Sequence, residues 1–412
     1  MNARNALTPD PALELLVPRN DCADPELSIV IPALNEEITI GEFVQWCHEG
    51  LAKAGVKGEI LIVDSSTDKT AQIALAAGAR VLKAPKRGLG RAYIDSLPFI
   101  RGKYVLMGDC DCTYDFRELK PFVDALRGGA EYVMGSRFTG YIEPGAMPAT
   151  HRYFGTPGTT WVLNRIFKSK FTDIHCGMRG MTKDALIRMD LQSQSWEYAS
   201  ELVLKSVHLK LRTAEVPIRF LKDKEGRLSH HRRMGWFSPW QAGWINLKAM
   251  FVNGPDFFLY RPGMLLFALG ALLLVPLSGG PITVGPITLS LYWQLLGLFL
   301  CTVGMPAMYL GILAQALFDY PSLRTRSWLA SFPYTRTTWL CVLAFLGGAA
   351  MSGSLVREYV GLGYSLPDHL SSVNFLAVTG LWLMSSAFQT FTFMLLLHAV
   401  GVVLPARLKE PA

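Results

Sequence analysis

The chain has little charge for its length. Asp, Glu, Lys and Arg make up 18% of its 412 residues, whereas a typical soluble domain contains about 25%. Hydrophobic residues make up 50%, which excludes an intrinsically disordered chain. The first 18 residues lack the continuous apolar core of a secretory signal peptide, so we expect none there.

Cysteine is also scarce, and its positions show no repeated spacing. The seven cysteines are an odd number, which argues against a disulfide framework. Free thiols are typical of proteins in reducing compartments. We therefore expect a cytosolic setting for the polar part of the chain.

Three long runs contain no Asp, Glu, Lys or Arg: 262–318, 337–356 and 370–406. A helix needs about 20 apolar residues to cross a bilayer, so the first run is too long for one helix. It is interrupted by a stretch rich in Gly, Pro and Thr. A buried soluble bundle is the alternative, but it would need charges on its surface. We expect a membrane domain over 262–406 with four helices, at about 263–278, 290–318, 337–356 and 373–404.

Basic residues flank these runs unevenly. Arg261 precedes the first helix, and Arg324, Arg326 and Arg336 lie between the second and the third. The positive-inside rule then predicts a multi-pass inner-membrane protein with both termini and residues 1–261 in the cytoplasm. The net charge is +7, and part of the excess of basic residues lies at this membrane border. This location favours a lipid bilayer as a partner and disfavours nucleic acid.

Residues 26–226 have the pattern of an α/β domain, preceded by an N-terminal extension, 1–25. Short apolar runs alternate with helical periodicity, which predicts βαβ units and a largely parallel sheet. The expected strands are 27–32, 59–64, 80–83, 104–108 and 132–135. Ligands bind beyond the carboxyl ends of such strands. Polar side chains follow three of these ends: Asn35 and Glu36, Asp64, and Asp109 with Asp111.

The segment 227–261 differs in composition from both halves. Trp236, Trp240 and Trp244 recur every four residues, so they share one helical face. Trp beside basic residues such as Arg232 predicts juxtamembrane amphipathic helices. A Trp stripe that packs on the catalytic domain is the alternative.

The pair Asp109 and Asp111, directly after an apolar strand, is the strongest local signal. Two carboxylates in this arrangement can share a divalent cation with a bound diphosphate. Mg²⁺ prefers one or two carboxylates together with substrate phosphates.

Several motifs, in this order and at this spacing, resemble one enzyme family. They are Pro32-Ala-Leu-Asn-Glu-Glu37, Asp64-Ser-Ser-Thr-Asp-Lys-Thr70, Lys86-Arg-Gly-Leu-Gly-Arg-Ala92, Asp109-Cys-Asp111, Gly135-Ser-Arg-Phe138 and Thr172-Asp-Ile-His-Cys-Gly-Met-Arg179. Together they resemble the GT-A glycosyltransferases of family 2, in the polyprenyl-phosphate subgroup that includes dolichol-phosphate mannose synthase and bacterial undecaprenyl-phosphate glucosyltransferases. The resemblance implies an α/β GT-A (Rossmann-like nucleotide-diphospho-sugar transferase) domain followed by an α-helical transmembrane domain.

The resemblance also implies a reaction. One sugar would pass, with inversion, from UDP-glucose or a similar donor, or from GDP-mannose, to a polyprenyl (undecaprenyl) phosphate on the cytoplasmic leaflet. Mg²⁺ or Mn²⁺ would be the cofactor. Association with further copies of the chain stays open.

Roles follow position by position from the resemblance. The nucleotide-sugar pocket and its metal would be formed by Pro32, Leu34, Asn35, Glu36, Asp64, Ser66, Lys86, Gly88, Asp109 and Asp111. The residues expected to contact phosphates of donor or acceptor are Arg137, Arg179, Lys222, Arg232 and Arg233. Glu201 would bind sugar hydroxyls or orient the acceptor, and an ordinary exposed helical face is the alternative. Asp109, Asp111, Arg137 and Glu201 form the expected catalytic set.

The sequence departs from the family at Cys110 and Cys112, where relatives have a small residue and often Asp. The loop after Asp64 lacks the usual Gly. A processive polysaccharide synthase is one alternative function, but it requires a Gln-x-x-Arg-Trp motif that the sequence lacks. An inactive membrane scaffold or lipid-binding protein is another, and the intact Asp109 and Asp111 argue against it.

Overall fold

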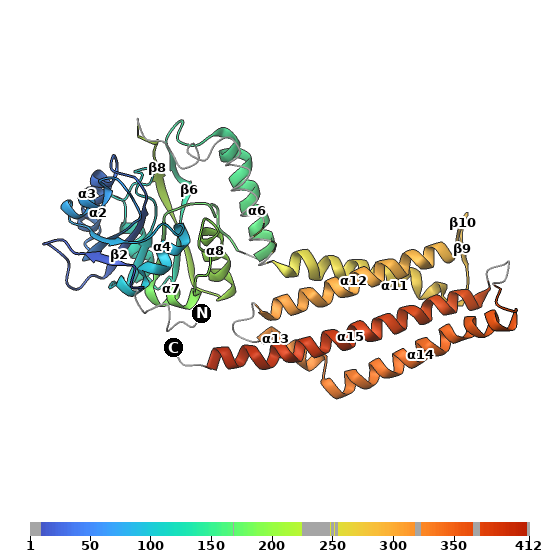
Figure 1. The fold of residues 1–412 in the computed structure, drawn as a ribbon. Coiled ribbons are helices and arrows are strands. Elements are labelled where there is room, and N and C mark those ends of the chain that lie inside the picture. Colours follow the sequence, from blue (N-terminus) through green and yellow to red (C-terminus); the bar gives the residue numbers. More distant parts are fainter. Residues whose placement is uncertain are drawn as a thin grey trace. The chain divides into compact units, whose positions relative to one another are not determined.

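The computed structural model describes residues 10–167, 169–224, 248, 251, 254–317, 323–365 and 371–409. The chain forms two compact units that divide between Val252 and Asn253, and Figure 1 shows their elements. This division lies inside the segment 227–261 that the sequence predicts as a junction. The other predicted domain borders stay predictions.

The N-terminal unit is built on a mixed sheet with helices. Its described strands are β1 (Glu14–Leu16), β2 (Leu27–Ala33), β3 (Gly58–Asp64), β4 (Arg80–Lys83), β5 (Tyr104–Met107), β6 (Tyr132–Ile142), β7 (Arg179–Thr182) and β8 (Thr213–Phe220). They form one sheet of eight strands in the order β1-β4-β3-β2-β5-β7-β6-β8. The five strands expected from the sequence are all present.

Most strands of the sheet run in the same direction. The same direction is shared by β4, β3, β2, β5, β6 and β8. Strand β1, at one margin, and strand β7, between β5 and β6, run antiparallel to their neighbours. The expectation of a largely parallel sheet is therefore confirmed, with β1 and β7 as the exceptions. The connection 143–178 leaves β6 and returns to the same edge of the sheet, so β7 must run in the opposite direction. The carboxyl ends of β2, β3, β5 and β6 meet at this edge.

The helices of this unit are α2 (Ile40–Ala54), α3 (Thr70–Ala76), α4 (Leu89–Ser96), α5 (Lys120–Arg127), α6 (Thr156–Phe167), α7 (Lys183–Met189) and α8 (Tyr198–His208), with the short turns η1 (Leu97–Phe99) and η2 (His151–Gly155). The helix α2 shows why they form. Phe43, Cys47 and Leu51 recur along one face and are buried, which is the pattern of an amphipathic helix on a sheet. The helix ends at Gly55, whose φ of 59° is the left-handed conformation that glycine adopts at low cost.

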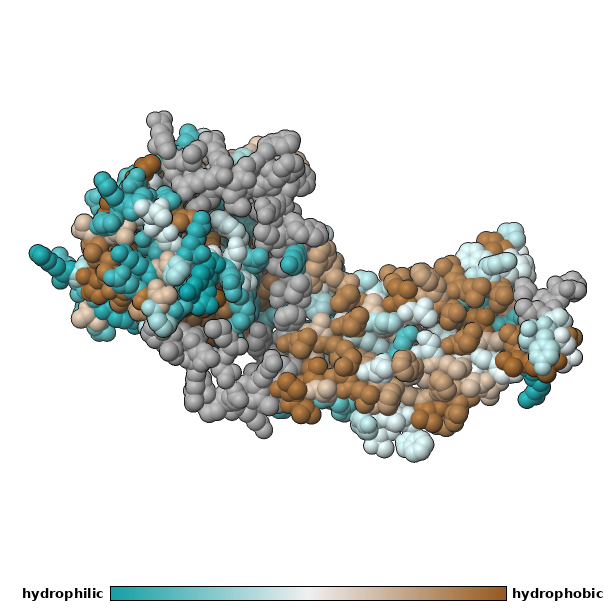
Figure 2. Space-filling model, in the orientation of Figure 1, coloured by the Kyte–Doolittle hydropathy of each residue, from teal (hydrophilic) through white to brown (hydrophobic). Residues whose placement is uncertain are grey.

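The C-terminal unit is helical. Its elements are η3 (Asp256–Tyr260), α11 (Arg261–Leu274), η4 (Pro276–Gly279), the hairpin β9 (Ile282–Val284) and β10 (Ile287–Leu289), α12 (Leu291–Leu317), α13 (Leu323–Ser331), α14 (Tyr334–Gly361) and α15 (Ser372–Lys409). Four helical spans among the described residues are long and apolar enough to cross a membrane: Asp256–Gly279, Leu291–Leu317, Tyr334–Gly361 and Ser372–Val403. This confirms the expected number. Figure 2 shows apolar side chains over much of the visible surface of this unit.

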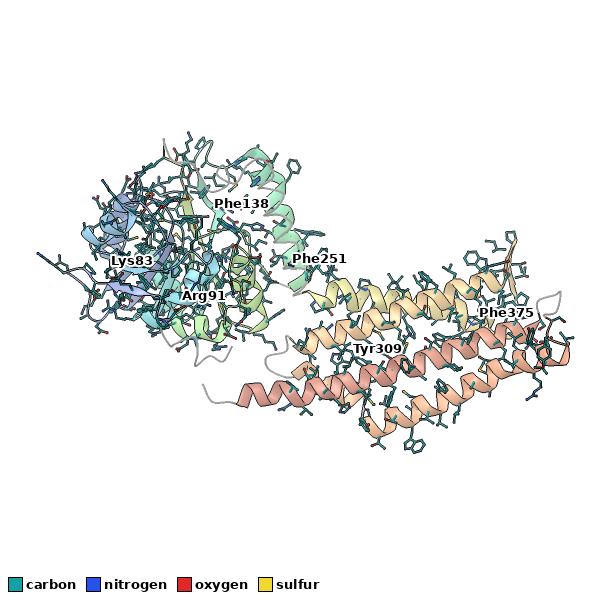
Figure 3. The ribbon with its side chains drawn as sticks, viewed as in Figure 1. Lys83, Arg91, Phe138, Phe251, Tyr309 and Phe375 are labelled. Atoms are coloured by element: carbon teal, nitrogen blue, oxygen red, sulfur yellow. The ribbon has the colours of Figure 1, made fainter. Side chains whose placement is uncertain are left out.

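Glycine allows α11 and α12 to approach closely. A Cβ atom at Gly304 would lie 2.4 Å from the backbone nitrogen of Phe267, and one at Gly263 would lie 2.5 Å from that of Met308. Small residues at helix contacts are the usual device for packing in membranes. Tyr309 on α12 stacks on Phe393 of α15 with ring centroids 4.1 Å apart, and Figure 3 labels Tyr309 in this helix.

Candidate active site

The loops after β2 and β3 are hydrogen-bonded to each other. The two strands are parallel, and Ala33 lies opposite Asp64 in their register. The backbone N–H of Asn35 donates to Ser66 Oγ at 2.7 Å, and Asn35 Oδ1 accepts from the backbone N–H of Thr67 at 3.0 Å. Asn35 has a φ of 56°, a conformation that Asn tolerates better than most residues. The sequence-predicted Asn35 and Ser66 are therefore brought together.

The neighbours of Asn35 are less exposed than Asn35 itself. Pro32, the next-to-last residue of β2, and Leu34 are partly buried, while Glu36 is buried. The backbone N–H of Glu36 donates to Thr70 Oγ1 at 2.9 Å, and its carboxylate accepts from Thr39 Oγ1 at 3.2 Å. Glu36 thus stabilises this loop through contacts with Thr70 and Thr39. Its contact with a nucleotide stays a prediction.

Asp64 is buried at the carboxyl end of β3. Its Oδ1 accepts from the backbone N–H of Ser66 at 3.3 Å. Burial raises the pKa of the Asp64 carboxyl, although its hydrogen bonds with Ser66 oppose this effect. A carboxylate accepts several hydrogen bonds, so Asp64 can accept from a ligand at this edge as well as from Ser66.

The motif that contains Lys86 and Gly88 connects β4 to α4, and both residues are exposed. Gly88 has a φ of 116°, and a Cβ atom there would lie 2.2 Å from the carbonyl oxygen of Gln194. A Cβ at Gly90 would lie 2.1 Å from the carbonyl oxygen of Ser193. The backbone N–H of Arg91, labelled in Figure 3, donates to the Gln194 carbonyl at 3.0 Å. These glycines are therefore required because two backbones pack directly against each other.

Asp109 and Asp111 follow β5 with alternating burial. Both are partly exposed, whereas Cys110 and Cys112 between and after them are buried. Asp111 Oδ1 accepts from the backbone N–H of Thr113 at 3.0 Å and from its Oγ1 at 2.6 Å. The two cysteines at which the sequence departs from the family are thus buried, whereas the two carboxylates are partly exposed.

Gly177 from the segment before β7 approaches Asp109. A Cβ at Gly177 would lie 2.6 Å from Asp109 Oδ2, and the backbone N–H of Gly177 donates to the hydroxyl oxygen of Tyr114 at 2.9 Å. Tyr93 is also near, since its hydroxyl donates to the Gly108 carbonyl at 3.2 Å. Sequence reasoning did not identify Tyr93 and Tyr114, because tyrosines in apolar surroundings give no signal of a site.

Arg137 on β6 is buried in an ion pair. Its Nε and Nη2 donate to the two carboxylate oxygens of Asp173 at 2.6 and 2.8 Å, and its guanidinium carbon lies 5.2 Å from the ring centroid of Phe220. Asp173 is completely buried, so the pair is not a surface salt bridge. The phosphate contact of Arg137 stays a prediction.

Arg179, the first residue of β7, is 1% exposed. Its guanidinium donates to the backbone carbonyls of Cys176 at 2.9 Å, Ala199 at 2.6 Å and Ile174 at 3.1 Å. The structure does not support the expected phosphate contact. Arg179 instead joins the loop before β7 to α8.

Glu201 also has a different place from the one expected. It lies in the first turn of α8 and is 8% exposed, so the alternative of an exposed helical face is wrong. Its carboxylate oxygens accept from the backbone N–H groups of Gln192 and Ser193, each at 2.9 Å, and Lys205 Nζ lies 2.7 Å away. Both oxygens hold the loop that packs on Gly88 and Gly90, so the structure does not support a sugar contact.

The expected phosphate-binding cations near the junction are only partly described. Lys222 is exposed after β8, and its backbone N–H donates to Glu143 Oε2 at 2.9 Å. Arg232, Arg233 and the Trp stripe lie outside the described residues. A cavity of about 840 Å³ lies at the opposite edge of the sheet and is lined by Lys57, Arg101, Arg212 and others. It is not the donor site, because ligands of such sheets bind at the carboxyl ends of the strands.

Known proteins resemble this chain in sequence. The family described as Glycosyl transferase family 2 matches residues 28–189. The low-salt glycan biosynthesis hexosyltransferase Agl6 of Haloferax volcanii is 35% identical over 352 residues, which cover 85% of this chain and 81% of the relative. The chain belongs to glycosyltransferase family 2. The dolichyl-phosphate hexose transferase of the same organism is 28% identical over 198 residues, 47% of this chain and 82% of the relative.

Solved structures resemble the chain more weakly. Glucosyl-3-phosphoglycerate synthase from Mycobacterium tuberculosis, in complex with Mn²⁺, UDP and glucosyl-3-phosphoglycerate, is 21% identical with a TM-score of 0.42, and the match covers 56% of this chain and 81% of that one. The mannosyltransferase PcManGT from Pyrobaculum calidifontis, in complex with GDP-Man and Mn²⁺, is 15% identical with a TM-score of 0.39, over 94% and 92% of the two chains.

One pair of side chains in this family 2 enzyme, Asp109 and Asp111, fits a divalent cation. The carboxylates of Asp109 and Asp111 are hard oxygen ligands of the kind that Mg²⁺ and Mn²⁺ prefer. Among the described residues, no three or more His, Cys, Asp or Glu side chains are grouped as a metal site. The pair therefore suits a cation whose coordination is completed by substrate phosphates and water.

Proposed function

We propose that this family 2 enzyme transfers one sugar from a nucleotide-sugar to a polyprenyl phosphate, with inversion at the anomeric carbon. The observation that carries the proposal is the extent of the similarity to the Haloferax hexosyltransferase. It covers 85% of the chain, and the chain carries four helices apolar enough to cross a membrane. A relative named for a dolichyl-phosphate substrate supports a lipid-linked acceptor. The donor we favour is UDP-glucose, with GDP-mannose second.

The donor lies, in this proposal, along the edge where β2, β3 and β5 end. Asn35, Ser66 and Asp64 contact the nucleoside, together with Pro32 and Leu34. Asp109 and Asp111 hold Mg²⁺ or Mn²⁺, which neutralises charge on the departing diphosphate when it is bound. Lys86 and Gly88 also lie along this edge. The loop that contains Gln192 and Ser193, which Glu201 holds, packs against Gly88.

The acceptor phosphate needs no strong general base. Its second pKa is about 6, so it is mostly dianionic at neutral pH. One of its oxygens attacks the anomeric carbon, and the bond from that carbon to the diphosphate oxygen breaks as the new bond forms. The nucleoside diphosphate leaves, and no proton has to be removed. This agrees with Glu201, whose carboxylate is occupied by two backbone N–H groups and a lysine.

The domains follow the same proposal. Residues 26–226 are the catalytic domain, 227–261 the juxtamembrane helices and 262–406 the membrane domain, with the catalytic domain and both termini in the cytoplasm. Arg137, Lys222, Arg232 and Arg233 attract the lipid phosphate.

The experiment uses the full chain in nanodiscs. Labelled UDP-glucose, GDP-mannose and a wider set of donors are offered with Mg²⁺ or Mn²⁺ and with undecaprenyl or dolichyl phosphate. We expect one donor to label the lipid and Asp111→Asn to abolish labelling. Asp124→Asn, at an exposed ion pair with Lys120 on α5, is the matched control and retains activity. If no donor labels either lipid, and Asp111→Asn binds nucleotide-sugar as well as the unchanged enzyme, the proposal is wrong.

A further inference from the structure

The described part of the N-terminal extension lies along one margin of the sheet. Its strand β1 pairs antiparallel with β4, and Glu14 lies opposite Lys83 in their register. Because β1 runs against β4, the residues before Glu14 lie at the carboxyl end of β4. This is the edge of the sheet that carries the candidate active site, and the proposed function gives the extension no role there.

Asp10 forms an ion pair with Arg87, in the loop between β4 and α4. Arg87 Nη1 donates to Asp10 Oδ2 at 2.5 Å. The other carboxylate oxygen accepts from the backbone N–H of Ala12 at 2.9 Å, and the Asp10 carbonyl accepts from the N–H of Leu13 at 3.0 Å. The segment around Asp10 therefore fixes this carboxylate while it binds Arg87.

Arg87 stands between the two residues of this loop that we place in the donor site, Lys86 and Gly88. All three residues are exposed, so the ion pair with Asp10 supplies an anchor that burial does not supply. Figure 3 labels Arg91, in the helix α4 that follows the loop. Lys86 and Gly88 are bonded directly to Arg87, so a restraint on the Arg87 side chain limits the position of both.

A second carboxylate lies within electrostatic reach of Arg87. Asp95 on α4 is buried, and its Oδ1 accepts from Arg91 Nε at 2.7 Å. Its Oδ2 is buried and has no hydrogen-bond partner in the part of the chain that the structure describes. Burial raises the pKa of the Asp95 carboxyl, and the charges of Arg91 and Arg87 oppose this rise. Without Asp10, the Arg87 guanidinium could turn towards this buried oxygen, and the loop would move with it.

We propose that Asp10 is a positioning residue of the donor site and holds the Lys86–Gly88 loop through its ion pair with Arg87. The inference rests on the proposed function only because it takes this loop as part of the nucleotide-sugar site. The hold of Asp10 on the loop applies to any donor. The side chains of Asp10 and Arg87 are 28% and 35% exposed, and such pairs contribute little to global stability. The effect is therefore expected in the loop and not in the melting temperature.

The extension has a second anchor, which provides a matched control. Arg101 Nη1 and Nη2 donate to the two carboxylate oxygens of Asp21 at 2.9 and 2.8 Å. Arg101 precedes β5, so this pair lies at the opposite edge of the sheet. Arg101 keeps a partner when Asp21 is changed, because its Nε donates to Glu59 Oε2 at 2.7 Å. Asp21→Asn therefore makes the same chemical change in the same extension, away from the donor site.

The test compares the full chain in nanodiscs with Asp10→Asn, Asp21→Asn and the exchanged pair Asp10→Arg with Arg87→Asp. Amide hydrogen exchange of residues 86–91 measures the loop in the absence of any donor. Titration with UDP and with GDP, in the presence of Mn²⁺, measures nucleotide binding. We expect Asp10→Asn to exchange faster in this loop and to bind nucleotide about two- to five-fold more weakly. The exchanged pair should recover part of both effects, and Asp21→Asn should show neither.

Three outcomes would overturn the proposal. The first is slow exchange of the loop in Asp10→Asn, as in the unchanged enzyme. The second is faster exchange with unchanged nucleotide binding, and the third is an equal loss of binding in Asp21→Asn. If the unchanged enzyme binds neither nucleotide, the proposed function fails and the donor-site role of Asp10 fails with it. Faster exchange in Asp10→Asn would still support its hold on the loop, so the two failures can be told apart.

Discussion

Asp173 and Arg137 form a buried ion pair with two parallel hydrogen bonds, at 2.6 and 2.8 Å. The backbone N–H of Arg137 also donates to the same carboxylate at 3.2 Å. The pair joins β6 to the loop before β7, and that loop continues to Gly177 beside Asp109. One carboxylate therefore connects the strand, the loop and the region of the expected metal site.

Removing Asp173 should destabilise the enzyme strongly. Asp173→Ala leaves the Arg137 guanidinium buried without its partner, which costs about 3–5 kcal/mol for a buried pair. Asp124→Ala removes an exposed pair with Lys120, for which about 1 kcal/mol or less is expected. Thermal unfolding of both variants in detergent measures the difference. Equal shifts of the two melting temperatures would show that the buried pair is not required for stability.

Loss of a hydrogen bond of Glu201 should change both amide hydrogen exchange and the kinetics of sugar transfer. Glu201→Gln replaces one acceptor oxygen by an NH₂ group, so the backbone N–H of Gln192 or Ser193 loses its partner. We expect faster amide hydrogen exchange at these residues and a raised KM for the nucleotide-sugar. A direct sugar contact would instead lower kcat with no change in exchange. Glu197→Gln, one turn earlier, serves as the control.

Methyl groups at Gly90 and Gly158 should have opposite effects. Gly90→Ala would place its Cβ 2.1 Å from the Ser193 carbonyl oxygen, so the loop must move and activity should fall at least as far as in Glu201→Gln. A Cβ at Gly158 on α6 has nothing within 4 Å. Gly158→Ala should therefore be neutral, or stabilising by about 0.4–1 kcal/mol. Measured activity and melting temperature separate the two, and a neutral Gly90→Ala would contradict the close packing.

His175 should make the enzyme less stable in acid. Burial lowers the pKa of His175 from 6.5 to about 4; Asp173 opposes the shift, and Arg137 adds to it. As the pH falls below 6.5, the unfolded chain therefore binds a proton that the folded chain does not bind. Stability present above that pH is lost towards about pH 4, by at most about 3 kcal/mol.

The measurement compares melting temperatures at about pH 7.5 and about pH 5. His175→Gln can still hydrogen-bond to Thr159 and lacks the titrating group, so its melting temperature should fall less between the two values. His48→Gln, at an exposed position on α2, should keep the slope of the unchanged enzyme. Identical slopes for all three proteins would exclude His175 as the source.

The elements that could be predicted from the sequence are those whose signal is local. The strand expected at 104–108 is β5 (Tyr104–Met107), and the apolar runs became the four long helices. The strand β1, the hairpin of β9 and β10 and the helix α13 were not predicted. These are short, and β1 forms only because β4 offers a partner edge.

The sequence by itself determined the family, the membrane helices and the edge where Asn35, Asp64, Asp109 and Asp111 lie, because these rest on short motifs after apolar strands and on long apolar runs, each of which is a local pattern. Only the tertiary structure decided what Arg179 and Glu201 do. A charged side chain beside a motif can face a ligand or a backbone, and that choice depends on segments distant in sequence. Here the carbonyl of Ala199 accepts a hydrogen bond from Arg179, and the N–H groups of Gln192 and Ser193 donate to Glu201. Buried backbone groups need hydrogen-bond partners, so they compete with ligands for these two side chains.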